Sequence, residues 1–168
     1  YHHEECAREL LKAGASLESK NNDGFTALMI SAQNGHTHIA RDLIKAGASL
    51  DAVSKTGETA LMKAAKRGHE QCVHTLLEHG AAVDATEEDG WTALMFAAQD
   101  GHAQVARARL ENGAAVDHVD EDWTALMFAA QNGHDPCARA LIEAKANLEA
   151  VESHGMTALH LTAQNGHT

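Results

Sequence analysis

The chain has 168 residues, of which 44% are hydrophobic and only 4% aromatic, and its formal net charge is −11. This charge argues against nucleic acid and anionic membrane surfaces as partners, because binding to both depends on Lys and Arg. The sequence contains no run of about 18 apolar residues, so it predicts no membrane insertion. Its start lacks the pattern of a secretory signal. Three cysteines without paired spacing favour an intracellular protein, in the cytoplasm first, with nucleus and organelles as alternatives.

In chain order, residues 1–20 predict one helix followed by a loop. A longer unit then begins at Thr26, a good N-cap that precedes apolar residues at helical spacing. Gly35 interrupts this helix, and a second amphipathic helix follows. Gly47 suits the left-handed position just past a helix end. The polar, turn-like residues 48–57 complete the unit as an extended finger.

The same unit recurs along the chain. The tripeptide Thr-Ala-Leu begins at Thr26, Thr59, Thr92, Thr124 and Thr157, at spacings of 33, 33, 32 and 33 residues. Such a period indicates stacked units, and the helical spacing within each unit predicts an all-α solenoid. We expect full units at residues 24–56, 57–89, 90–121 and 122–154, with partial units at 1–23 and 155–168. Because both ends stop inside a unit, we expect a longer chain or a larger complex.

The pattern resembles the ankyrin repeat family over nearly the whole chain. Gly90-Trp-Thr-Ala-Leu-Met-Phe-Ala-Ala-Gln-Asp-Gly-His102 matches the family's Gly-x-Thr-Pro-Leu-His-x-Ala-Ala-x-x-Gly-His, and Leu76-Leu-Glu-His-Gly-Ala81 matches its Leu-Leu and Gly-Ala positions. Ala replaces the family's Pro throughout, and Met replaces its His except at His160. Apolar packing of Met is expected to offset the lost hydrogen bonds. The resemblance implies helix pairs joined by β-hairpin or finger loops, and a protein-binding role in place of catalysis.

The resemblance also implies a binding surface on the concave face, made by the finger tips and the exposed side of each first helix. Trp91 and Trp123 occupy one position in neighbouring units, and aromatic anchors dominate protein interfaces. The alternative is that each ring packs on its own finger and helix. The predicted partner-binding residues are Phe25, Gln33, Asn34, Lys55, Glu58, Lys66, Arg67, Glu88, Asp89, Trp91, Gln99, Asp100, Glu121, Asp122, Trp123, Gln131, Asn132, His154 and Met156.

Charge along this surface changes sign, from basic near Lys55, Lys63, Lys66 and Arg67 to acidic near the two tryptophans. Such a pattern can orient a partner and speed its association. We therefore predict a protein partner whose docking segment carries basic and apolar residues.

Histidine and cysteine are the residues that could indicate a metal site. His36, His69, His102, His134 and His167 share one repeat position, and Cys6, Cys72 and Cys137 share another. Equivalent residues of stacked helices lie about 8–10 Å apart, too far to converge on one zinc ion. The cysteines are expected on the core face of the second helix as small hydrophobes. We predict no metal, no cofactor and no catalytic residue.

Three positions depart from the repeat. Asp122 and Lys145 stand where other units have glycine, so left-handed backbone is expected at Asp122 and about 1 kcal/mol of strain at Lys145. Arg109 stands where other units have a core leucine. A buried unpaired charge is costly, so the guanidinium is expected to reach water or a carboxylate.

These observations favour a protein-interaction scaffold that is not an enzyme. Two alternatives stay open: a targeting module attached to a larger enzyme, and an accessory structural subunit of a large assembly. Nucleic-acid binding ranks behind both because the chain is acidic.

Overall fold

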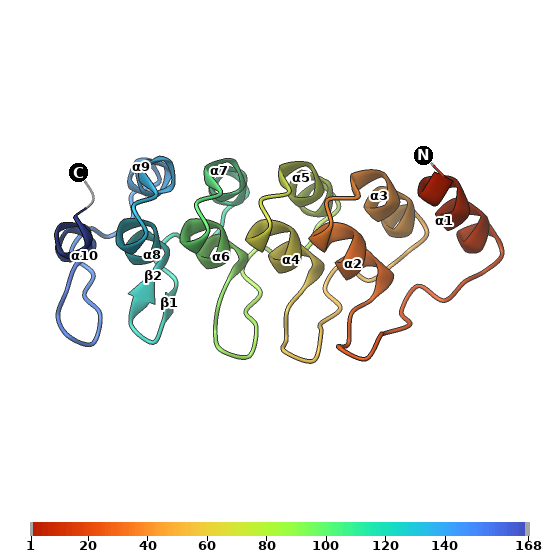
Figure 1. Cartoon of the computed structure of the whole chain (residues 1–168), viewed down its shortest axis with the longest axis horizontal. Helices are drawn as coiled ribbons and strands as arrows, with labels where there is room; N and C mark the ends of the chain where they lie inside the picture. Colours follow the sequence, from red (N-terminus) through yellow and green to blue (C-terminus); the bar gives the residue numbers. More distant parts are fainter. Residues whose placement is uncertain (1, 167–168) are drawn as a thin grey trace.

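A computed structural model describes residues 2–166 of the chain, with side chains for residues 4–166. The described helices form two parallel rows, with the connecting fingers projecting from one side (Figure 1). The outer row is α1 (His2–Lys12), α3 (Thr37–Lys45), α5 (Glu70–Glu78), α7 (Ala103–Glu111) and α9 (Asp135–Glu143). The inner row is α2 (Ala27–Gln33), α4 (Ala60–Lys66), α6 (Ala93–Gln99), α8 (Ala125–Gln131) and α10 (Ala158–Asn165). This arrangement confirms the all-α repeat solenoid.

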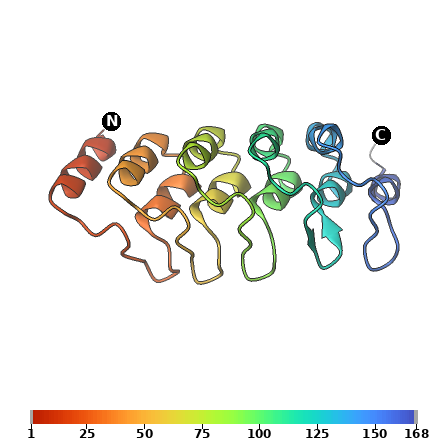
Figure 2. The same cartoon turned by 180° about the vertical axis from the view of Figure 1, so that it is seen from behind.

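The view from behind shows the two rows in register, with the two ends of the chain at opposite ends of the array (Figure 2). We number the fingers by the inner helix they precede: the first at residues 13–26, then 46–59, 79–92, 112–124 and 144–157. None of the described helices is long and apolar enough to cross a membrane.

Each inner helix begins at the threonine that the sequence singled out. The Oγ1 of Thr26 accepts a hydrogen bond from the Met29 amide at 3.3 Å, and the threonines of the next three units do the same. Met29 also accepts, through its Sδ, the amide of Thr26 at 3.5 Å. At His160, where the family residue is kept, Nδ1 accepts the Thr157 amide at 3.2 Å. In the first unit a methionine sulfur thus takes the acceptor position that the histidine nitrogen has in the last unit.

Successive units are joined by histidines at the start of the outer helices. His69 donates from Nε2 to the carbonyl of Gln33 at 3.0 Å, and His102 and His134 make the same contact one and two units further along. Each accepting carbonyl belongs to the last turn of an inner helix, where no partner exists within the helix. A Cβ on Gly35 would lie 2.7 Å from His69 Nδ1, and Gly35 also has φ of 72°. These histidines therefore have a structural role; His167 lies outside the described residues.

The core runs between the two rows and includes Arg109. The prediction that its guanidinium reaches water or a carboxylate was wrong. Its side chain is fully buried in α7, at the position of the buried Leu76 and Leu141. Its Nε, Nη1 and Nη2 have no hydrogen-bond partner among the described residues. Burial lowers the pKa of Arg109 to about 10, and attraction to Asp84 offsets this only in part. The guanidinium does not reach water because α7 packs between the outer helices α5 and α9 and against the inner helix α6.

Exposure changes at the two ends of the array. Cys72 and Cys137 are fully buried, and burial raises the pKa of Cys137 to about 11. Cys6 is exposed, so the prediction of a core position was wrong for it, because no inner helix of its own unit lies among the described residues. Likewise Leu159 is 77% exposed whereas its counterpart Leu126 is 3% exposed, because no outer helix covers α10 in the described part of the chain.

The fourth finger forms the β-hairpin that the resemblance implied for every finger. Its strands β1 (Val119–Asp120) and β2 (Trp123–Thr124) pair antiparallel across a two-residue turn. Both turn residues have positive φ, 42° at Glu121 and 68° at Asp122, as a tight hairpin of this hand requires. This finger lies in the 32-residue spacing between Thr92 and Thr124, which is one residue shorter than the others. The tight turn accommodates the shorter finger. Lys145 has φ of 68°, so the residue after α9 adopts the left-handed backbone on which the predicted strain depends.

Candidate functional site

The candidate site is the finger face, which we define as the fingers together with the side of the inner helices that faces them. All the fingers except the fourth, which forms the β-hairpin, share one internal hydrogen-bond pattern. A side-chain oxygen of Asn21, Ser54, Glu87 or Glu152 accepts the amides two and four residues later, at 2.8 to 3.3 Å. Finger backbones are also linked to each other, from Lys55 N–H to Asp23 and from Glu88 N–H to Thr56. The finger tips are therefore held as a preformed surface.

Glu152 shows how strongly this pattern binds a carboxylate. Its side chain accepts hydrogen bonds from the His154 ring at 2.8 Å and from the amides of His154 and Met156, both at 3.0 Å. Burial of the carboxylate raises the pKa of Glu152, but these donors outweigh burial and hold the pKa at about 2. The fifth finger is thus stabilised by an ionised acid that is only 4% exposed.

This arrangement predicts how the fifth finger responds to acid. Because the folded pKa of Glu152 is depressed, its stabilising effect is complete above the ordinary pKa of 4.5 and is lost as pH falls towards about 2. The Met156 amide shift in NMR spectra should therefore stay constant from pH 7 to pH 4. In Glu152→Gln the same amide should show no titration at any pH. A midpoint near 4.5 in the unmodified protein would contradict the assignment.

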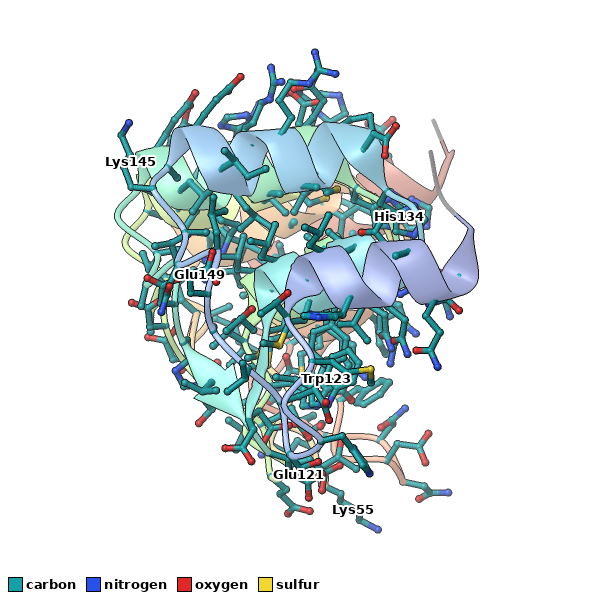
Figure 3. All side chains as sticks on the ribbon, turned by 90° about the vertical axis from the view of Figure 1, so that its left-hand side faces the viewer. Lys55, Glu121, Trp123, His134, Lys145 and Glu149 are labelled. Atoms are coloured by element: carbon teal, nitrogen blue, oxygen red, sulfur yellow. The ribbon has the colours of Figure 1, made fainter. Side chains whose placement is uncertain are left out.

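Trp91 and Trp123 lie on the finger face within a row of side chains in contact with one another, which we call the ladder. The ring centroids of Trp91 lie 5.1 Å from Phe96 and 4.4 Å from Phe128, and Trp123 lies 5.1 Å from Phe128. Seen along the array, Trp123 lies in the angle between the inner helices and the fingers (Figure 3). Both tryptophans are half-buried and both phenylalanines are buried. The rings thus help to join the units, and their exposed parts remain on the finger face.

The second unit replaces an aromatic pair of the ladder with an ion pair. Lys63 and Glu58 occupy the positions of Phe96 and Trp91, and their side chains are in contact and only 9% and 13% exposed. The Lys63 ammonium also lies 4.3 Å from the ring centroid of Phe25, as Phe128 lies over Trp91. Burial raises the pKa of Glu58, but hydrogen bonds from Lys63 and Thr56 outweigh it, so the pKa is lowered.

Phe96 and Phe128 are ladder members that the sequence prediction missed, and Lys63, expected at the basic end of the surface, is instead buried in the ladder and paired with Glu58. They share one repeat position, which reads Ile30, Lys63, Phe96, Phe128 and Leu161 along the chain. This position varies from unit to unit, and that variation is the signal that could have identified it.

The other predicted residues fall into two groups. The half-buried residues are Gln33, Gln99 and Met156. The exposed residues are Lys55, Lys66, Arg67, Glu88, Asp89, Asp100, Glu121, Asp122, Gln131 and His154. Asn34 and Asn132 use their side-chain amides within their own units, donating to Ile30 and Phe128 at 2.9 Å. Figure 3 shows Lys55 and Glu121 at the finger tips.

A pocket of about 330 Å³ lies on the finger face between the second and third fingers. Its lining includes the aromatic residues Trp91 and Phe96 and the charged residues Glu87, Asp89 and Lys66. The Lys66 ammonium lies 4.8 Å from the ring centroid of Phe96. This pocket combines ring surfaces with charged groups, which is the composition of a recognition site.

No group of three or more metal-ligating side chains occurs in the part of the chain that the structure describes. The histidines at the unit junctions are used in hydrogen bonds to backbone, as shown above, and the two buried thiols lie in the core.

Comparison with known families agrees with the fold. A family model described as ankyrin repeats (3 copies) matches residues 1–54, 39–120 and 109–168, and so spans the chain. No curated protein matches the sequence. Ankyrin repeats are protein-protein interaction modules and are typically not enzymes. The fold, the Thr-capped inner helices and the matched regions together show that this chain belongs to the ankyrin-repeat family.

Proposed function

We propose that this chain binds a partner protein across the finger face, at the third and fourth units. The observation that carries the proposal is the ladder, in which half-buried Trp91 and Trp123 both contact the ring of Phe128. Tryptophan is the residue type most enriched among energetic hot spots. A preformed surface also loses little conformational entropy on binding.

The charges around the ladder support a basic docking segment. Glu88, Asp89, Asp100, Glu121 and Asp122 are exposed near the tryptophans, and Lys55, Lys66 and Arg67 are exposed one unit earlier. A partner with basic residues beside an apolar anchor would meet the acidic end. Acidic residues at the other end of the segment would fix its direction.

The test is substitution of the two anchors. Affinity purification with mass spectrometry identifies a partner, and calorimetry then measures its Kd for the unmodified chain and for each variant. Trp91→Ala and Trp123→Ala should each weaken binding by about 2 kcal/mol. Losses below about 0.5 kcal/mol in both variants would remove this site.

Two controls separate binding from folding. Ile142→Ala shortens an exposed side chain of the outer helix α9, outside the finger face, and should leave the affinity unchanged. Trp91→Phe keeps a ring against Phe96 and Phe128, so it should retain the fold that Trp91→Ala weakens. Circular dichroism on each variant confirms that the array is folded at the temperature of the binding measurement.

The module also fits within a targeting region of a larger enzyme, or as an accessory subunit in an assembly. Stoichiometric co-purification and a large apolar interface would favour the accessory role. We propose an intracellular location, in the cytoplasm first and with nucleus and organelles as alternatives, which the three free cysteines support.

A further inference from the structure

We propose that the pocket between the second and third fingers receives an arginine side chain of the partner. The inference rests on the proposed function, since it assigns one contact of the same finger face. The lining of the pocket contains the aromatic residues Trp91 and Phe96 and the acidic residues Glu87 and Asp89. A cation that enters would meet aromatic faces and negative charge together.

The chain itself shows that ladder rings hold cations. The Lys63 ammonium lies 4.3 Å from the centroid of Phe25, and the Lys66 ammonium lies 4.8 Å from the centroid of Phe96. Both distances are within the range of cation–π attraction. Lys63 is buried and held by Glu58, whereas Lys66 is exposed at the end of α4. Without a partner, the Lys66 ammonium therefore lies over the Phe96 ring, but no ion pair with a described residue holds it there.

The charged groups that face the pocket favour a positive guest. Glu58 is neutralised by Lys63, and Oε1 of Glu87 accepts the amides of Asp89 and Trp91 at 3.1 and 3.0 Å. The Asp89 carboxylate is exposed and has no ion-pair partner among residues 4–166. Among the described residues that line the pocket, Lys66 is the one with a positive charge, and its flexible side chain can move out to solvent.

Arginine fits this pocket better than lysine. A guanidinium is planar, so it can stack on Trp91 while its N–H groups reach a carboxylate of the lining. An ammonium offers no plane to stack and keeps more of its hydration.

The experiment follows the indole N–H signals of the two tryptophans by NMR. The probe is N-acetylarginine N-methylamide, and the citrulline analogue serves as a neutral control of nearly the same shape. The arginine probe should shift the Trp91 signal saturably and leave the Trp123 signal in place. The citrulline probe should shift neither signal.

Two variants test the charges, with a matched control. Lys66→Gln introduces the residue found at this position in the other units, such as Gln99, and should tighten arginine binding about threefold by removing the competing charge. Asp89→Asn should weaken it about threefold. Glu143→Gln, the change at an exposed acid of the outer helix α9, away from this pocket, should have no effect.

Equal shifts by arginine and citrulline would overturn the proposal, as would weaker binding to Lys66→Gln or a response confined to Trp123. Because the probe is a small molecule, its failure is distinct from failure of the proposed function. If a partner binds normally but the probe does not bind, only the proposed arginine pocket is contradicted. A probe that binds as expected while both tryptophan variants keep full partner affinity would sink only the partner site.

Discussion

Replacing Arg109 with leucine is expected to raise the free energy of unfolding by about 2–4 kcal/mol. The guanidinium is fully buried and its three nitrogens have no hydrogen-bond partner among the described residues, so folding removes a charge from water and only the attraction to Asp84 offsets part of the cost. Leucine fills the same position in the neighbouring units, at Leu76 and Leu141, where it is fully buried. The substitution therefore restores the packing that the solenoid repeats elsewhere.

Urea unfolding followed by circular dichroism measures this change, and the slope of the transition shows whether unfolding remains cooperative. The control is Arg107→Leu, which removes an exposed arginine two residues earlier in α7 and should change stability by less than about 0.5 kcal/mol. A lower stability for Arg109→Leu would mean that Arg109 makes a contact that the array needs.

Breaking the Lys63–Glu58 pair should have an effect of similar size and opposite sign. Glu58→Gln should lower the free energy of unfolding by about 3 kcal/mol, because it leaves the Lys63 ammonium 9% exposed with no opposing charge in contact. The effect should shrink in acid. The pKa of Glu58 is lowered by folding, so the stability it adds is present above 4.5 and is lost as pH falls through the folded value.

The matched control is a double substitution taken from the chain itself. Glu58→Trp with Lys63→Phe gives the second unit the pair found at Trp91 and Phe96. A well-packed apolar pair commonly equals or exceeds a buried ion pair, so the double variant should be at least as stable as the unmodified protein. Measuring both single variants completes a double-mutant cycle. A double variant as unstable as Glu58→Gln would show that the unit requires the charges.

Local sequence determined the repeated unit. The threonine caps, the glycines after each helix and the apolar spacing act within a few residues of one another, so their pattern predicted the helices and their order. The same locality made backbone irregularities readable. Asp122 and Lys145 stand at glycine positions, and both adopt the positive φ that those positions impose.

Contacts between units were decided only by the tertiary structure. Whether Arg109 reaches water depends on the outer helices on either side of α7, and whether Cys6 is buried depends on an inner helix beside α1. The ladder, in which Lys63 takes the place of a phenylalanine, joins residues about forty positions apart. A periodic sequence specifies the stacking of units, but the neighbours that each side chain meets across a junction are set by packing in three dimensions.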